Sequence, residues 1–93
     1  MNGETDMRFF TVVAQRSSLS EAALELGLTA SAVSRRLARM EDRLGVRLIN
    51  RTTRRVSLTS EGEAYLAASM DIIDRIAVAE EAIVSARGEP QGL

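Results

Sequence analysis

Histidine, cysteine, tryptophan and lysine are all absent from this chain of 93 residues. Without histidine and cysteine, the usual zinc ligand sets and the Ser-His and Cys-His pairs that activate nucleophiles are excluded. Carboxylates are present, but none falls in a recognisable acid/base or metal-binding motif. An enzyme is therefore the least favoured class, and the sequence predicts no catalytic residue, metal or cofactor within these 93 residues.

Long apolar runs are missing as well. No stretch approaches the roughly 18 apolar residues that span a bilayer, and the N-terminus lacks the basic and apolar regions of a signal peptide. These absences predict a cytoplasmic protein with no membrane partner. With 93 residues, of which 45% are hydrophobic, the chain is expected to form one small domain. Its modest core would gain from a second copy.

The net charge of −1 conceals an uneven distribution of charge. Residues 35–55 hold eight arginines and two acids, a net charge of +6, whereas residues 1–34 and 56–93 are both acidic. All twelve basic residues are arginine, which favours forked contacts to phosphate and guanine. The middle of the chain is therefore predicted to meet an anionic partner.

Two helices separated by a tight break are predicted within residues 20–44. Ser20 is a suitable N-cap for the first, Gly27 suits the left-handed position that ends it, and Thr29 caps the second. Two pairs have the spacing of hydrophobic staples across these helix starts: Leu19 with Leu24, and Leu28 with Val33. Two helices joined by so short a turn are typical of the helix-turn-helix that reads the DNA major groove.

The second of these helices is expected to have two unlike faces. Its apolar face consists of Val33, Leu37, Met40 and Leu44. Its opposite face consists of Ser31, Ser34, Arg35, Ala38 and Arg39. A solvated surface is the ordinary role of such a polar face. Small residues mixed with arginine also let a helix approach DNA closely, which favours DNA reading.

A winged arrangement is predicted after Gly45, which ends that helix. Residues 47–50 and 56–58 alternate like short strands, joined by the arginine-rich connection 51–55. A ribbon of this kind directly after a helix-turn-helix is a wing, suited to phosphates or the minor groove. An exposed basic loop is the alternative.

Helices are also predicted at both ends of the chain. The first covers residues 7–16, with Thr5 or Asp6 as its cap and with Phe9 and Phe10 as core anchors. The last begins after Thr59 and runs to residue 85 or 87, about twice the mean helix length of 11–12 residues. Its second half has nothing in the chain to pack against, so a second copy is the simplest partner. The predicted dimerisation residues are Tyr65, Ile72, Ile73, Ile76, Ala79 and Ile83, although Tyr65 could instead fold back onto the chain's own core.

The strings AVSRRLARMEDRLGVRL and NRTTRRVSLTSEGE resemble the N-terminal DNA-binding domain of LysR-type transcriptional regulators. The resemblance covers nearly the whole chain without gaps. It implies a mainly α fold, a winged helix-turn-helix of three helices and a two-stranded β wing, followed by a long dimerisation helix. Residues 1–58 would form the winged helix-turn-helix and residues 59–87 the linker and dimerisation helix. Residues 88–93 would be a hinge to an absent effector-binding domain.

The resemblance further implies that the start of the recognition helix and the wing tip contact DNA. The matching positions are Ala30, Ser31, Ser34, Arg35 and Arg54, with Thr29, Arg36, Arg39, Arg51 and Arg55 as secondary candidates. Many family members have glutamine at position 30. Alanine cannot hydrogen-bond a base edge, though its methyl group could contact thymine.

The partners implied by the resemblance are a two-fold-related double-stranded DNA operator and a second copy of the chain. The full-length protein would form a tetramer, work at the bacterial nucleoid, and bind a small-molecule inducer only in its C-terminal domain. The alternative is a protein-interaction module whose long helix is the functional surface. Acidic groups of a partner subunit that neutralise the arginines would favour this second interpretation.

Overall fold

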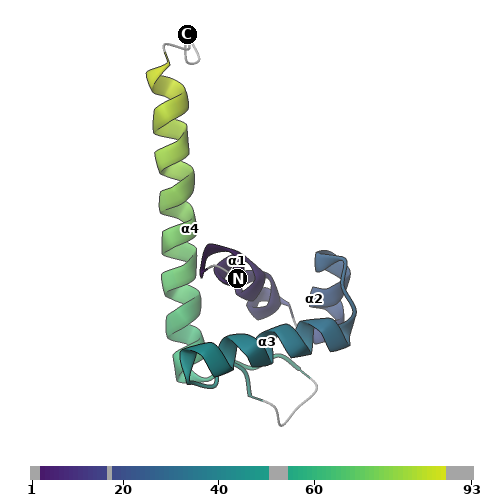
Figure 1. The fold of residues 1–93 in the computed structure, drawn as a ribbon. Helices are drawn as coiled ribbons and strands as arrows, with labels where there is room; N and C mark the ends of the chain where they lie inside the picture. The colour runs from purple at the N-terminus through teal and green to yellow at the C-terminus, as the bar shows by residue number, and fades with distance from the viewer. Residues whose placement is uncertain (1–2, 17, 51–54, 88–93) are drawn as a thin grey trace.

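The computed structural model describes residues 3–16, 18–50 and 55–87, and these are mainly helical. The helices are α1 (Gly3–Gln15), α2 (Leu19–Leu26), α3 (Ala30–Leu44) and α4 (Ser60–Ala86). The first three gather around one core, and α4 leaves this bundle as a long arm (Figure 1). The expected mainly α architecture with a long last helix is confirmed. Arg51, Arg54 and the predicted hinge at residues 88–93 lie outside the described residues.

Polar caps determine where three of the helices begin. The side chains of Ser18, Thr29 and Thr59 each accept a hydrogen bond from the backbone N–H three residues further on. The predicted caps at Thr29 and Thr59 are confirmed, but Ser20 is wrong, because Ser18 caps α2. This earlier cap makes Leu19 the first residue of α2. Leu24 then faces outward and is 84% exposed, so the predicted staple is absent.

The first helix also begins earlier than predicted, at Gly3 rather than Met7. Thr5 and Asp6 lie inside α1 and do not cap it. The Asp6 carboxylate is fully buried and pairs with arginines of α3, a distant contact that its position in the sequence does not reveal.

Glycine ends α2 and α3 as predicted. Gly27 and Gly45 adopt left-handed backbone angles, with φ of 70° and 75°. The Gly27 N–H bonds carbonyls of α2, and the Gly45 N–H bonds the Glu41 carbonyl, so each glycine satisfies the last turn of its helix. The reversal at Gly27 lies between α2 and α3, which meet at an angle as in a helix-turn-helix (Figure 1).

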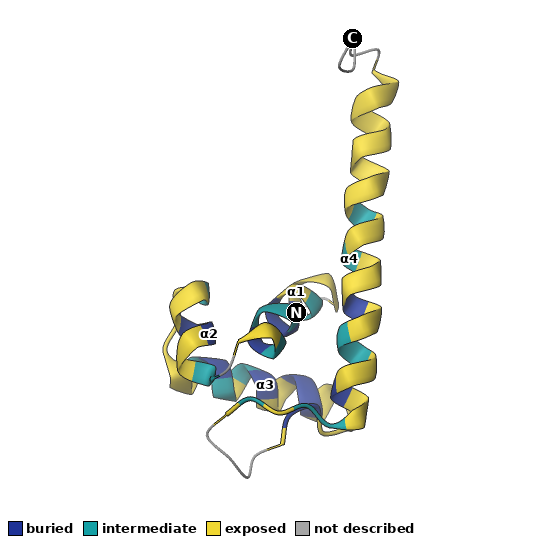
Figure 2. Cartoon of the chain, turned by 180° about the vertical axis from the view of Figure 1, so that it is seen from behind, coloured by how far each residue is buried: buried dark blue, intermediate teal, exposed yellow. Residues whose placement is uncertain are grey.

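The core joins α1, α2, α3 and the segment after α3. Phe10, Val13, Val33, Leu37 and Met40 are fully buried, and the predicted anchors Phe9 and Phe10 are both in this core. Leu44, expected on the apolar face of α3, is 37% exposed in its last turn. The buried positions gather in the bundle and the first turns of α4, whereas the rest of α4 is largely exposed (Figure 2).

The described arms of the predicted wing pair only locally. Ile49 bridges Leu58, and the Asn50 N–H donates to the Ser57 carbonyl at 2.8 Å. Arg55 bridges Ser18 instead of a residue on the other arm. No continuous strand forms within residues 47–50 and 55–59, so the two-stranded wing expected from the sequence is not confirmed. One physical reason is that Arg55 pairs with the α1–α2 connection.

Glu41 holds the segment after α3 in place. Its buried carboxylate accepts hydrogen bonds from the backbone N–H groups of Leu48 and Ile49, at 2.8 and 3.1 Å. The Leu48 carbonyl in turn accepts the Thr59 N–H at 3.1 Å, just before α4 begins. A carboxylate of α3 therefore fixes residues 48–49, the backbone that hydrogen-bonds the residue before α4.

Gly62 makes a testable close approach. A Cβ atom at this position would overlap the Leu48 carbonyl oxygen, because the first turn of α4 lies directly on that backbone. We expect Gly62→Ala to lower the free energy of unfolding by about 1–3 kcal/mol, measured by denaturant titration. Gly3→Ala is the matched control, since a Cβ there meets nothing within 4 Å. Equal stability of the two variants would contradict the predicted overlap.

Candidate nucleic-acid interface

The four arginines of α3 divide between two faces of the helix. Arg35 and Arg39 are exposed, and neither makes a hydrogen bond or ion pair with another described residue. Ser31, Arg35 and Arg39 follow one another at intervals of four residues, so they lie along the same side of α3. This side is a cationic strip that the fold leaves available to an external anion.

Arg36 and Arg43 lie on the side of α3 that meets α1. Arg43 Nη2 lies 2.8 Å from Asp6 Oδ2, and Arg36 Nη2 lies 3.5 Å from Asp6 Oδ1. The Arg36 guanidinium also stacks 4.3 Å from the centroid of the Phe9 ring and donates to the Thr5 carbonyl. The sequence groups Arg36 with the secondary DNA candidates, but the structure assigns its guanidinium to the α1–α3 contact.

Smaller side chains surround the start of α3. Ala30 and Ser31 are exposed, Ser34 is half-buried, and the Thr29 hydroxyl caps the helix by accepting the Ala32 N–H at 3.0 Å. The uncompensated N–H groups and positive dipole end of a helix favour an anion at this point. The helix start and Arg35 thus present positive potential on adjoining surface.

Asp42 is a residue that sequence reasoning missed. It is exposed, and its spacing from Arg35 and Ala38 places it on the same side of α3, toward the C-terminal end. A carboxylate there repels phosphate, so the positive part of this side ends before the last turn of α3. Its helical spacing from Arg35 and Ala38 could have predicted that Asp42 lies on this side.

Of the three arginines in residues 51–55, the structure describes Arg55. Arg51 and Arg54 lie outside the described residues. Arg55 is exposed, and its backbone bridges Ser18 at the start of α2. The structure therefore brings Arg55 to the helix-turn-helix, on the N-terminal side of α2.

The long helix α4 carries the predicted dimerisation face. Ile72 and Ile83 are 39% and 67% exposed, Ala79 is exposed, and Ile73 and Ile76 are half-buried. Tyr65 differs from this set because its ring packs against Phe10 of the same chain, with centroids 5.2 Å apart. Tyr65 is therefore a core residue of this fold, and the available apolar face begins beyond it.

The described part of the chain holds neither a candidate metal site nor a membrane-spanning helix. No group of three or more acidic side chains there could hold a metal ion. No helix of residues 3–16, 18–50 and 55–87 is both long and apolar enough to cross a bilayer.

Comparison with known proteins identifies the family. Residues 5–63 match the family described as bacterial regulatory helix-turn-helix protein, lysR family. The chain belongs to the LysR family. This LysR-family chain is 41% identical over 88 residues to the HTH-type transcriptional regulator CrgA of Neisseria meningitidis. It is 38% identical over 88 residues to DmlR of Escherichia coli. Each match covers 95% of the chain and only 29% of the regulator.

Solved LysR-family structures share the fold. The structure of CrgA from Neisseria meningitidis is 40% identical, with a TM-score of 0.74, over 99% of this chain and 31% of that one. A complex of the CbnR DNA-binding domain with DNA is 25% identical, with a TM-score of 0.82, over 94% of this chain and 99% of that domain. The helical part of the predicted LysR-type fold is confirmed by these similarities.

Tyr65 offers a pH-dependent test of how the LysR-family helices pack. Burial, and secondarily the Asp6 carboxylate, raise the pKa of the Tyr65 phenol above its ordinary 10.0, against an opposing effect of Arg43. The folded state then holds a proton that the unfolded state loses near pH 10. This contribution to stability is complete below pH 10 and is lost as pH rises through the folded pKa.

Because Tyr65 is the single tyrosine and tryptophan is absent, phenolate absorbance reports its titration directly. We expect the native chain to titrate at higher pH than the chain in denaturant. Tyr65→Phe should make the free energy of unfolding fall less steeply above pH 10 than in the unchanged chain. Superimposable native and denatured titration curves would contradict the packing.

Proposed function

We propose that this chain is a DNA-binding domain of a LysR-type transcriptional regulator, binding double-stranded DNA sequence-specifically with α3 in the major groove. The observation that carries the proposal is the division of the α3 arginines. Arg36 and Arg43 are used inside the fold, while Arg35 and Arg39 are exposed and meet no acid among the described residues. The solved complex of the similar CbnR DNA-binding domain with DNA supports DNA as the partner.

The side chains along α3 suit different contacts. Arg35 has the fork that pairs with the O6 and N7 atoms of guanine, and Arg39 suits a phosphate. Ser31 and Ser34 are small polar groups that let α3 approach the floor of the major groove closely. Thr29 and Ala30 lie at the helix start, where a phosphate or a thymine methyl group is the expected neighbour.

The wing is the second proposed contact. Residues 51–55 carry Arg51, Arg54 and Arg55, which suit the backbone or the minor groove. Two observations support a wing-like path. The flanking residues Ile49 and Leu58 pair, and Glu41 anchors the first arm to α3. The proposed operator contact therefore combines α3 with the segment that Glu41 positions.

The protein-interaction alternative has less support. It requires acids that neutralise the arginines in the middle of the chain. The buried acids Asp6 and Glu41 contact Arg36, Arg43 and Arg47, and the outward side of α3 keeps its positive charge. This distribution favours a polyanion such as DNA as the partner.

Salt-dependent binding and the variant Arg35→Ala test the function. The chain should bind a selected duplex more tightly than a random one, and its affinity should fall steeply with salt because phosphate contacts release counterions. If Arg35 reads a base, Arg35→Ala should reduce the discrimination by about 1–3 kcal/mol, measured by fluorescence anisotropy on both duplexes.

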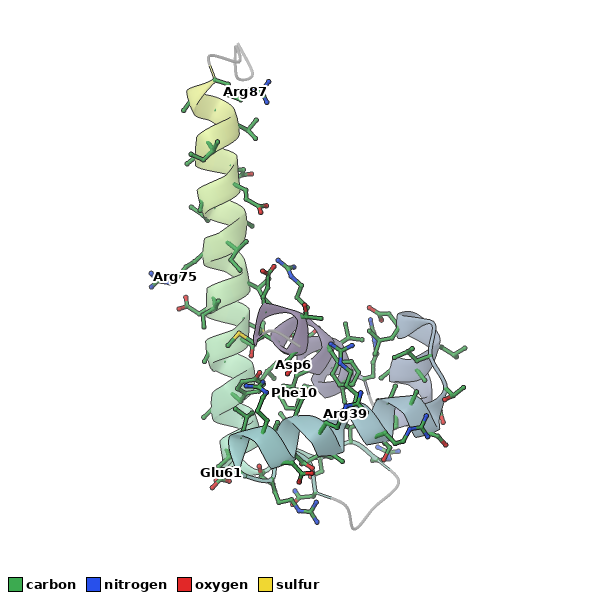
Figure 3. The ribbon with its side chains drawn as sticks, in the orientation of Figure 1. Asp6, Phe10, Arg39, Glu61, Arg75 and Arg87 are labelled. Carbon is green, nitrogen blue, oxygen red and sulfur yellow. The ribbon has the colours of Figure 1, made fainter. Side chains whose placement is uncertain are left out.

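Arg87→Ala is the matched control, since Arg87 lies at the far end of α4, remote from α3 (Figure 3). It should leave the discrimination unchanged. Salt-independent binding, or equal affinity for selected and random duplexes, would overturn the proposed function. Equal losses on both duplexes for Arg35→Ala would instead assign Arg35 to a phosphate.

We also propose that two copies pair through α4 on a two-fold-related operator. Ile72, Ile76, Ala79 and Ile83 recur at helical spacing along one side of α4, and Ile72, Ala79 and Ile83 are exposed in the single chain. Covering an exposed apolar stripe of this length with a second apolar surface lowers the free energy of the pair.

Ile83→Glu tests this pairing. Burying a carboxylate in place of an apolar side chain should raise the dimer dissociation constant by at least about tenfold, measured by sedimentation equilibrium. Ser85→Glu adds the same charge two residues away on another side of α4 and should leave the dissociation constant nearly unchanged. An unaltered dimer in Ile83→Glu would place the interface elsewhere.

A further inference from the structure

Asp6 occupies the junction of three helices. It lies on α1 with a fully buried side chain, and its two oxygens reach Arg36 and Arg43, seven residues apart on α3. Asp6 and Phe10 both lie where α1 meets α3 and α4 (Figure 3). A buried ion pair contributes little net stability on average, because desolvation offsets the attraction. Its directional contacts instead favour one arrangement of the helices over its neighbours.

α1 is one of the links between α3 and α4, beside the backbone contact of Leu48 with Thr59 at the start of α4. α1 packs against both α2 and α4, and α2 packs against α3. Phe10 of α1 contacts Tyr65 of α4, while Asp6 of α1 binds Arg43 of α3. Apolar contacts such as Phe10–Tyr65 tolerate small sliding movements. The Asp6 carboxylate accepts a hydrogen bond from Arg43 at Oδ2, at 2.8 Å, and its Oδ1 lies 3.5 Å from Arg36, so the directional Arg43 contact resists rotation and sliding of α3.

We infer that Asp6 is a positioning residue that sets the angle between α3 and α4, and thereby the half-site spacing that a dimer selects on DNA. The inference rests on the proposed function. With 27 residues, α4 is about 40 Å long, so a tilt of about 5° at its base moves its far end by about 3.5 Å. That displacement is close to the rise of one base pair, about 3.4 Å. Asp6 touches no base in this arrangement and acts on spacing alone.

The test uses the chain and a library of duplexes with two randomised half-sites separated by spacers of different length. The wild-type chain should select one spacing. Asp6→Asn removes the charge that holds both arginines. It should reduce the preference for the best spacing over spacers one or two base pairs different by about five- to tenfold, while the selected half-site sequence stays the same.

Glu4→Gln is the matched control. Glu4 is an exposed acid of the same helix, its ion pair is with Arg8 of α1, and its removal changes the net charge equally. It should keep the wild-type spacing preference. A purely stabilising role for Asp6 would lower the unfolding temperature without altering the preference among spacings, so thermal unfolding is measured alongside.

Arg43→Gln provides a second variant if Asp6→Asn does not fold, because the Arg43 side chain is 45% exposed and its loss leaves the Arg36 contact in place. Arg8→Gln is its control. Arg43→Gln should also broaden the spacing preference. A folded Asp6→Asn or Arg43→Gln that keeps the wild-type preference overturns the inference and leaves the proposed function intact. A wild-type chain that selects no sequence at any spacing overturns the proposed function itself.

Discussion

The carboxylate of Asp6, buried where α1 meets α3 and α4, determines which arginines of α3 are held inside the fold. It hydrogen-bonds Arg43 and lies beside Arg36, while Arg35 and Arg39 stay exposed. Removing water from a carboxylate is costly unless cations replace it, so the acid and the two arginines constrain each other. The orientation of α3 about its own axis follows from this contact together with the apolar residues Val33 and Leu37.

A second buried acid, Glu41, fixes the segment that follows α3. Its carboxylate binds the backbone N–H groups of Leu48 and Ile49, and Thr59 then hydrogen-bonds Arg47 and Leu48 before α4 starts. Two buried carboxylates thus link the helix-turn-helix to the path of the wing and to the base of the long helix. The surface proposed to meet DNA is positioned by acidic groups that do not face it.

The long helix serves a different purpose from the bundle. It packs on α1 through Tyr65, and burial extends to the half-buried Ile73 and Ile76, while Ile83 and Val84 near its end are more than half exposed. Its acids Asp74, Glu80 and Glu81 are exposed in the second half of the helix, whereas Glu61 and Glu63 lie in its first turn. This separation of charge allows a chain with a net charge of −1 to have a cationic surface on α3.

Local chemistry in the sequence determined the helix-turn-helix. The caps Thr29 and Thr59 and the left-handed glycines Gly27 and Gly45 act on backbone groups within a few residues, so they could be predicted without the fold. Long-range contacts decided the rest. The sequence predicts Asp6 as a helix cap, but in the fold it binds Arg43, 37 residues away. Arg36 and Arg39 look alike in sequence, yet only Arg36 meets Phe9 and Asp6. Which side of a helix is buried depends on groups brought together only when the chain folds, and this divided the arginines of α3.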